Sequence, residues 1–178
     1  SSVKIVENIR SKTFVLGDST QIHQIFMNMF TNSAQAMEKD GGGTLEVVVE
    51  DTYLEERMAR NFGTLEPGPH VGITVSDTGE GISEDIIGSV FEPYFTTKEV
   101  GHGTGMGLAV VHGIVAGLGG HISVESEKGK GAVFNIYLPA TDYIDESEAS
   151  EEEEIVGGIE RILFVDDDRA IVKANTEA

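Results

Sequence analysis

The sequence contains no cysteine and few basic residues, and both shortages narrow the range of functions. Without cysteine, the chain can form neither a disulfide bond nor a thiolate metal site, which fits a reducing cytosol. Only 12 Lys and Arg stand against 31 Asp and Glu, which argues against nucleic-acid binding because phosphate contacts need basic patches. We therefore expect no nucleic-acid partner.

Long hydrophobic runs are also missing. No apolar stretch approaches the roughly 20 residues that a membrane-spanning helix needs. The first residues, SSVKIVENIR, lack the apolar core of a signal peptide. We expect a cytoplasmic segment that makes no membrane contact itself, although its parent protein can be membrane-anchored. Because a strand starts as early as Val3, we also expect this sequence to be a piece of a longer protein.

Composition divides the 178 residues into three segments. Residues 1–140 alternate periodic apolar stretches with glycine-rich loops and predict one ordered domain. Residues 141–158 begin with TDYIDESEASEEEE, in which every charged residue is acidic, and predict a solvated linker. Residues 159–178, which contain ERILFVDDD, predict the start of a second ordered unit that stops after one strand and part of a helix.

The first segment predicts an α/β domain with a mixed, largely antiparallel sheet. Alternating apolar residues predict strands, and glycine and proline predict the loop at 63–70. An N-cap at Asp18 or Ser19 predicts a long helix to about Met37, and a second helix continues to about Ala116. The expected strands are 3–8, 14–16, 44–52, 71–76, 121–126 and 132–138, the last two forming a hairpin.

Two amides lie one helical turn apart in NMFTN, at the edge of the apolar stripe of the first helix. The stripe comprises Ile22, Ile25, Phe26, Met29, Phe30, Ser33 and Met37, with Ser33 as its one small member. Asn28 and Asn32 can offer two carbonyl oxygens to one hard cation such as Mg²⁺. Gln21 and Gln35 share their flank, so the alternative is a polar helix side that faces solvent.

A carboxylate follows an apolar strand in VSDTGEGI. Asp77 can only accept hydrogen bonds, so it can receive the exocyclic amine of adenine, whereas guanine would present another acceptor. Gly79 and Gly81 would let the backbone approach a flat ring closely. The alternative is an ordinary strand that ends in an Asp-Thr-Gly turn.

Four glycines in GHGTGMGL open the second helix. Ordering such a glycine-rich loop costs conformational entropy. Loops of this kind are typical of sites where backbone amides surround an anion at a helix N-terminus. The motif is neither a Walker loop, because Gly-Lys-Ser or Gly-Lys-Thr is absent, nor a dinucleotide fingerprint, because no apolar strand precedes it. A flexible linker is the alternative.

The segment FEPYFTTK precedes that loop. Its aromatic residues predict a lid anchored by Phe91 and Phe95, from which Lys98 would reach a phosphate. The alternative is a surface loop with buried aromatics.

In order and spacing, these four motifs resemble the histidine-kinase branch of the gyrase, chaperone, kinase and MutL ATPase superfamily. NMFTN resembles its N box, DTGEGI its first glycine box, FEPYFTTK its F box and GHGTGMGL its second glycine box. The resemblance covers residues 3–139. It implies the Bergerat fold, a two-layer α/β sandwich with helices on one face of a mixed sheet, and it implies ATP and Mg²⁺ as ligands.

The resemblance also implies roles for individual residues. Asn32 would bind Mg²⁺ with help from Asn28, and Asp77 would bind the adenine amine. Lys98 and the backbone amides of the lid would contact phosphate. The remaining implied nucleotide contacts are Gly79, Gly81, Ile82, Thr97, Gly103, Thr104, Gly105, Met106, Gly107 and Leu108. His23, His102 and His112 receive no role, and we expect them to be structural or solvent-facing.

Asn28 favours phosphate transfer over hydrolysis. In the ATP-hydrolysing branches, a glutamate at this position activates water, and loss of a general base typically costs about 10²–10⁴-fold in rate. The resemblance therefore implies a protein-histidine kinase of a two-component system. In that family the accepting histidine lies on a dimerising helical hairpin, which is absent here. Phosphotransfer would need this partner domain, supplied in cis or in trans.

The tail resembles the first strand of a receiver domain. In RILFVDDD, Asp166 and Asp167 match the receiver's Mg²⁺-binding acidic pair, although the rest of that site is absent. This predicts a hybrid sensor kinase that signals to a receiver domain or response regulator in a phosphorelay. Two alternatives to the kinase remain: an ATP-hydrolysing machine related to gyrase or MutL, and a non-catalytic module with a degenerate pocket.

Overall fold

Six strands of the described chain form one sheet with the order β1-β3-β4-β6-β2, and β5 also pairs with β6. The computed structural model describes residues 2–38, 41–62, 65–97 and 105–141. The strands are β1 (Ser2–Ile9), β2 (Phe14–Val15), β3 (Gly42–Leu54), β4 (Gly68–Asp77), β5 (His121–Ser126) and β6 (Ala132–Thr141). The helices are α1 (Ser19–Ala36), α2 (Glu56–Asn61), the short 3₁₀ helix η1 (Ile87–Ser89) and α3 (Gly107–Gly117).

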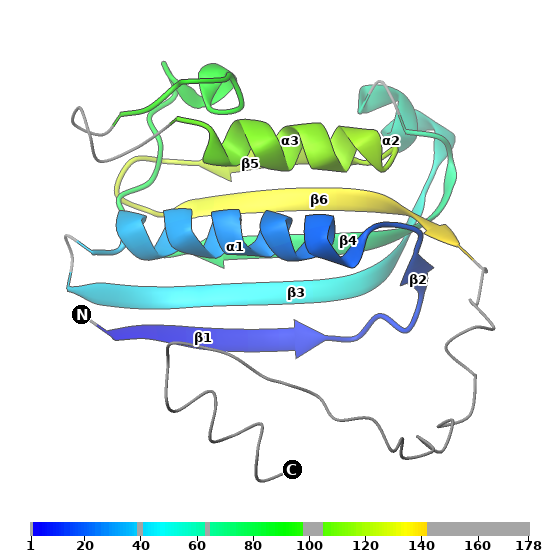
Figure 1. Cartoon of the computed structure of the whole chain (residues 1–178), viewed down its shortest axis with the longest axis horizontal. Helices are drawn as coiled ribbons and strands as arrows, with labels where there is room; N and C mark the ends of the chain where they lie inside the picture. Colours follow the sequence, from blue (N-terminus) through cyan, green and yellow to red (C-terminus); the bar gives the residue numbers. More distant parts are fainter. Residues whose placement is uncertain (1, 39–40, 63–64, 98–104, 142–178) are drawn as a thin grey trace, which may run out of the picture. The chain divides into compact units, whose positions relative to one another are not determined.

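The sheet is mixed and largely antiparallel, as predicted. Among the described strands, only β1 and β3 run parallel, and the pairs β3–β4, β4–β6, β5–β6 and β2–β6 are antiparallel. The two long helices, α1 and α3, lie along one face of the sheet (Figure 1). This arrangement confirms the predicted two-layer α/β sandwich.

All six predicted strands are present, but β3 and β4 extend further than predicted. They pair in an unbroken register from Leu45 opposite Asp77 to Leu54 opposite Gly68. The segment at 68–70, predicted as part of a loop, therefore belongs to β4. Thr141, predicted as the first linker residue, pairs with Phe14 at the end of β6. The predicted linker from residue 142 onward and the tail with Asp166 and Asp167 lie outside the described residues.

The apolar stripe of α1 determines how this helix packs. Its N-cap is Asp18, whose Oδ1 accepts from the Thr20 backbone N–H at 2.7 Å. Hydrogen bonds from the backbone and the side chain of Thr20 lower the pKa of the Asp18 carboxyl. Ile25 and Met29 are fully buried against the sheet, while Phe26 packs on the same core from the edge of the stripe. The predicted periodicity is therefore confirmed.

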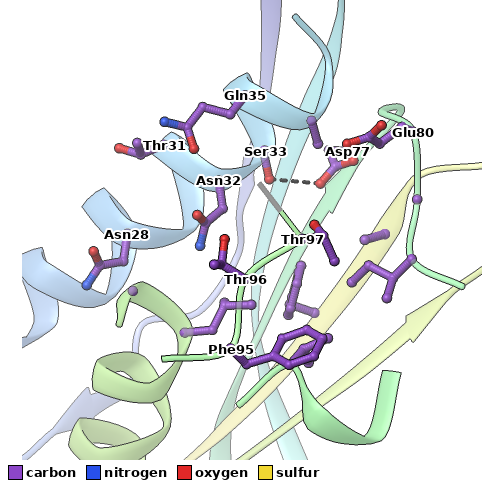
Figure 2. A pocket seen from close by; sticks show the side chains of 18 of the residues that line it. Asn28, Thr31, Asn32, Ser33, Gln35, Asp77, Glu80, Phe95, Thr96 and Thr97 are labelled. Carbon is purple, nitrogen blue, oxygen red and sulfur yellow. Dashed lines mark hydrogen bonds between the residues drawn. The ribbon is translucent and has the colours of Figure 1, made fainter. Parts of the chain in front are cut away.

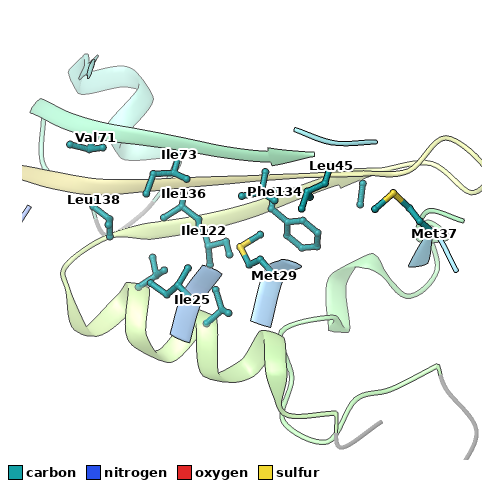
Figure 3. Packing of buried hydrophobic residues seen from close by; sticks show 14 residues of the cluster. Ile25, Met29, Met37, Leu45, Val71, Ile73, Ile122, Phe134, Ile136 and Leu138 are labelled. Atoms are coloured by element: carbon teal, nitrogen blue, oxygen red, sulfur yellow. The ribbon is translucent and has the colours of Figure 1, made fainter. Parts of the chain in front are cut away.

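One core joins both long helices to the sheet (Figure 3). Val111 and Val115 of α3 are fully buried in it. Burial of each such aliphatic side chain contributes about 1.5–3 kcal/mol, so this core fixes α1 against α3. The sheet contributes Leu45, Val71, Ile73, Val75, Ile122, Phe134, Ile136 and Leu138.

The short helix α2 was not predicted, and it packs on the other face of the sheet. Tyr137 alternates along β6 with the core residues Ile136 and Leu138, so its side chain lies on the opposite face. The Phe62 ring, at the end of α2, stacks on Tyr137 with centroids 5.1 Å apart. None of the helices in the described part of the chain combines the length and hydropathy that a bilayer crossing requires.

Candidate functional site

A pocket of about 580 Å³ lies between α1, the loop after β4, the segment before residue 98 and the start of α3. Figure 2 shows polar side chains of α1 on one side of it and the aromatic ring of Phe95 on the other. Its volume is in the range of small-molecule sites. The apolar part of its wall is formed by Ala36, Ile82, Ile86, Val90, Phe95, Leu108, Ala132 and Phe134.

Asp77 is the buried acid of this pocket, with only 7% of its surface exposed. It stands at the end of β4, a strand with partners on both sides. The Ser33 hydroxyl donates to its Oδ2 at 2.9 Å, and the Gly79 backbone N–H donates to its Oδ1 at 2.9 Å. Each carboxylate oxygen keeps further acceptor capacity for a ligand, because an ionised carboxylate has about four lone-pair sites.

The loop after Asp77 is held from two sides. On one side, the Glu80 N–H donates to the Ala36 carbonyl at the end of α1. On the other, the Gly129 N–H donates to the Glu80 carbonyl at 2.7 Å, and the Ile82 N–H donates to Ser126 Oγ at 2.8 Å. The hairpin between β5 and β6 thus supports the pocket wall.

Both glycines of this loop have a structural reason to be glycine that the sequence did not reveal. A Cβ atom on Gly79 would lie 2.8 Å from the Ala36 carbonyl carbon, and Gly79 does not line the pocket. Gly81 lines the pocket and has φ = +64°, and its Cβ would lie 2.2 Å from the Glu127 carbonyl oxygen. Both positions therefore require glycine for contact within the chain, whether or not a ring binds nearby.

Asn28 and Asn32 meet the start of α3. They line the same pocket as Asp77, and a Cβ atom on Gly107 would lie 3.6 Å from Asn28 Oδ1 and 3.5 Å from Asn32 Nδ2. Figure 2 shows both amides projecting from α1. The two predicted amides and the last glycine of GHGTGMGL thus come together.

The N-terminus of α3 opens on the pocket. Gly107 and Leu108, its first residues, both line the pocket, and no side chain of the described residues caps the helix. Backbone N–H groups at such a terminus favour an anion. Gly105 also lines the pocket, whereas Met106, also predicted as a contact, does not and is 45% exposed.

The aromatic segment before residue 98 forms the facing wall. Phe95, Thr96 and Thr97 line the pocket across from α1 (Figure 2). Phe91 packs against the main core, and its ring lies 5.6 Å from that of His112. Both predicted anchors, Phe91 and Phe95, are therefore partly buried.

The predicted contacts thus fall into three groups. Asn28, Asn32, Asp77, Gly81, Ile82, Thr97, Gly105, Gly107 and Leu108 share one pocket. Gly79 and Met106 adjoin it without lining it. Lys98, Gly103 and Thr104, together with His102, lie outside the described residues. His23 and His112 are exposed, as predicted.

The sequence did not identify several residues of the pocket. The helical period places Ser33 in the apolar stripe, and its position beside Asn32 is the one local signal for a role in the site. Ala132 and Phe134 come from β6, which follows Asp77 by more than fifty positions, so no local pattern connects them with it. The other unpredicted lining residues are Thr31, Gln35, Ala36, Glu80, Ile86, Val90 and Thr96.

The described part of the pocket is acidic. Asp77 and Glu80 line it, and no Lys or Arg does so among the described residues. Within the same ranges, no group of three His, Asp or Glu side chains is arranged to hold a metal ion. A metal here would thus rely on amide oxygens and on oxygens of the ligand, and the adjacent Asn28 and Asn32 amides fit such a hard cation.

Comparison with known proteins connects this geometry to one family. Residues 17–142 match the model of the histidine kinase-, DNA gyrase B-, and HSP90-like ATPase family. The chain is 39% identical over 125 residues to the sensor kinase CckA of Brucella abortus (strain 2308), covering 70% of this chain and 13% of that protein. It is 38% identical over 125 residues to the sensor histidine kinase ZraS of Escherichia coli (strain K12), covering 70% of this chain and 23% of that protein. It thus spans less than a quarter of each of these relatives.

Solved structures show the same fold. The catalytic domain of histidine kinase ThkA matches with a TM-score of 0.58 and 28% identity, over 77% of this chain and 78% of that one. Full-length ShkA in complex with AMPPNP matches with a TM-score of 0.59 and 26% identity, over 78% of this chain and 26% of that one. Fold, site and sequence agree: the chain belongs to the histidine kinase-, DNA gyrase B-, and HSP90-like ATPase family.

Proposed function

We propose that this chain binds ATP with Mg²⁺ and donates the γ-phosphate to a histidine on a separate dimerisation and phosphoacceptor domain. The observation that carries the proposal is the single pocket that holds Asp77 at one end and Asn28, Asn32 and the α3 N-terminus at the other. A nucleotide needs both ends, because its base and its phosphates differ in chemistry. The likeness to sensor kinases such as CckA and ZraS supports the choice of a kinase.

The base would bind at Asp77. The buried carboxylate accepts from the exocyclic amine of adenine, while the apolar wall around Ile82 and Phe134 covers the flat ring. A 6-oxo purine would bring an acceptor against an acceptor there. The site therefore selects adenine over guanine.

The phosphates would bind at the start of α3. The backbone N–H groups at the start of α3, near Gly107, would face the anion, and Asn32, assisted by Asn28, would hold the metal. Since Asp77 and Glu80 make the described wall acidic, a bound cation also offsets repulsion of the triphosphate. When bound, Mg²⁺ neutralises phosphate charge before and during transfer. Lys98 and Gly103 remain predicted phosphate contacts, and Gly79, Thr104 and Met106 remain predicted nucleotide contacts.

Transfer is favoured over hydrolysis because of Asn28. An amide cannot remove a proton from water near neutral pH, so the pocket lacks a general base at this position. The chain would then act by positioning the γ-phosphate for an incoming protein nucleophile. The proposal extends to a hybrid sensor kinase working in the cytoplasm, with a receiver domain or response regulator as the next acceptor and with Asp166 and Asp167 as part of a receiver site.

A two-part experiment tests the proposal. First, titration calorimetry on the full chain should show MgATP binding that Asp77→Ala abolishes and that the exposed control Asp85→Asn keeps. Second, γ-labelled ATP and a purified phosphoacceptor domain should give a labelled acceptor whose phosphate is stable to alkali and labile to acid, as phosphohistidine is. Replacement of the accepting histidine should remove the label.

Two results would reject the proposal. Unchanged MgATP affinity in Asp77→Ala would exclude the base-binding role of this carboxylate. Rapid turnover of ATP into water without any acceptor would instead indicate the hydrolysing branches of the family.

A further inference from the structure

A buried hydrogen bond joins α1 to β4 at the floor of the pocket. The Ser33 hydroxyl, only 2% exposed as a residue, donates to Asp77 Oδ2 at 2.9 Å (Figure 2). The two residues are 44 positions apart in the chain. Both line the pocket, so this bond lies within the ligand site.

The bond determines what the pocket floor offers to a ligand. A serine hydroxyl has one hydrogen and two lone pairs, and here the hydrogen is committed to Asp77. The remaining polar capacity of this pair consists of lone pairs on Ser33 Oγ and on the Asp77 oxygens. At this pair a ligand therefore meets acceptors only, because the Ser33 hydroxyl has no hydrogen left to donate to a carbonyl.

The bond also orients the carboxylate. Asp77 Oδ1 is held by the Gly79 N–H and Oδ2 by Ser33, so both oxygens are fixed, one from the following loop and the other from α1. Charge-assisted bonds of this kind are stronger than neutral ones. Rotation of the carboxylate away from a repelling ligand group would break one of them.

We propose that Ser33 is a specificity-determining residue: it positions Asp77 and offers no free donor beside it, so that 6-aminopurine nucleotides bind and 6-oxopurine nucleotides are rejected. This inference rests on the proposed ATP-binding function and adds a second residue to the recognition of the base. Ser33 acts on the base largely through Asp77.

The test compares MgATP with magnesium inosine triphosphate, which carries a carbonyl group where ATP carries the amine. Calorimetry on the full chain gives the dissociation constants of both nucleotides for wild type and Ser33→Ala. Ser33→Ala removes the hydrogen bond to the charged Asp77 carboxylate. The less well oriented carboxylate should then bind ATP about tenfold more weakly. Inosine triphosphate should lose less affinity than ATP, because the Asp77 carboxylate, once free of Ser33, can turn away from the carbonyl group of the inosine base. The ratio of the two dissociation constants should therefore shrink several-fold.

Ser33→Thr keeps the hydroxyl and should restore the ratio to within about threefold of wild type. Should threonine not fit this buried position, Ser33→Cys keeps the size with a weaker donor, and should give an intermediate ratio. The matched control is Ser76→Ala. Ser76 is a half-buried serine next to Asp77 in the chain, and its variant should bind both nucleotides as the wild type does. Melting temperatures without nucleotide establish that each variant is folded.

The possible outcomes separate the two proposals. Equal weakening of both nucleotides in a folded Ser33→Ala variant, with an unchanged ratio, would overturn the specificity role and leave ATP binding intact. An unchanged affinity of Ser33→Ala for both nucleotides would also overturn the specificity role. Failure of the wild type to bind MgATP would overturn the proposed function and, with it, this inference.

Discussion

Gly79 and Ala36 are in direct backbone contact: a Cβ atom on Gly79 would lie 2.8 Å from both the carbonyl carbon and the Cβ of Ala36. The same approach brings the Glu80 N–H to the Ala36 carbonyl at 3.1 Å. The end of α1 and the loop after β4 therefore form one unit. Ser33 and Asp77, which share a hydrogen bond, lie three and two residues from this contact, so the contact supports the pocket floor.

Gly79→Ala should destabilise the domain by about 1–3 kcal/mol, because the added methyl group cannot fit without a backbone shift. It should also weaken nucleotide binding. Thermal unfolding measures the first effect and calorimetry the second. Gly88→Ala is the control, since a Cβ there meets nothing within 4 Å. Equal melting temperatures for the two variants would contradict the packing argument.

Asn32→Ala should impair phosphate transfer more than nucleotide binding. The base would keep its contacts at Asp77, whereas the metal would lose an oxygen ligand. We expect a change of a few-fold in the dissociation constant of ATP and a fall of roughly 10²-fold in the rate of labelled transfer, similar to the loss of one preorganised stabilising group. The exposed Gln24→Ala on the same helix should transfer normally. A larger loss in binding than in transfer would reverse the assignment.

Acidification should destabilise the domain through His121. Burial lowers the pKa of this imidazole from its usual 6.5, and the nearby His112 adds to the effect. The unfolded chain therefore binds more protons than the folded one between the two pKa values. This contribution to stability is complete above about pH 6.5 and is lost as the pH falls toward the folded-state pKa.

Denaturant unfolding across pH 5 to 8 checks the role of His121. The ring lies 4.7 Å from that of Phe62, so His121→Phe keeps an aromatic contact and should flatten the pH dependence. The exposed His23→Gln should leave the slope as it is in the wild type. An identical slope in wild type and His121→Phe would exclude this histidine as the source.

Gly113→Ala should stabilise α3. This glycine is in the interior of the helix, and a Cβ there meets nothing within 4 Å, so alanine gains helix propensity of about 0.5–1 kcal/mol at no steric cost. The melting temperature should rise by a few degrees. Gly120→Ala should lower it, because its Cβ would lie 2.5 Å from the Tyr137 carbonyl oxygen. A loss of stability in Gly113→Ala would indicate a partner for this helix face.

Local patterns predicted those elements whose period reflects one buried face. The spacing of Ile25 and Met29 located α1, and alternation in HISVES gave β5 with its correct bounds. The helix α2 was missed because its six residues, ERMARN, are too few to show a helical stripe. Strand β3 was predicted too short at both ends. Gly42 and Gly43 are extended here through pairing with β1, and Tyr53 and Leu54 through pairing with Pro69 and Gly68 of β4, a segment that had been predicted as a loop.

The site was only partly predictable for a related reason. Asn28, Asn32 and Asp77 stood out because amides at i and i+4, or an acid at a strand end, are local features. The bond from Ser33 to Asp77 and the support of Ile82 by Ser126 each span 44 positions and depend on how the elements pack. The sequence pattern places Ser33 in the apolar stripe because a small serine side chain can pack in a core as readily as it can donate a hydrogen bond, and the pattern does not distinguish the two.

The position of Asp77 at the end of β4 has a consequence for hydrogen exchange. Strand β4 is paired with β3 on one side and with β6 on the other, so its amides open only when the centre of the sheet opens. A nucleotide held there would slow exchange in all three strands. At a ligand concentration of 100 times Kd, the gain is about 2.7 kcal/mol, which corresponds to exchange roughly a hundredfold slower. The edge strand β1, which the pocket does not touch, would respond least to saturation.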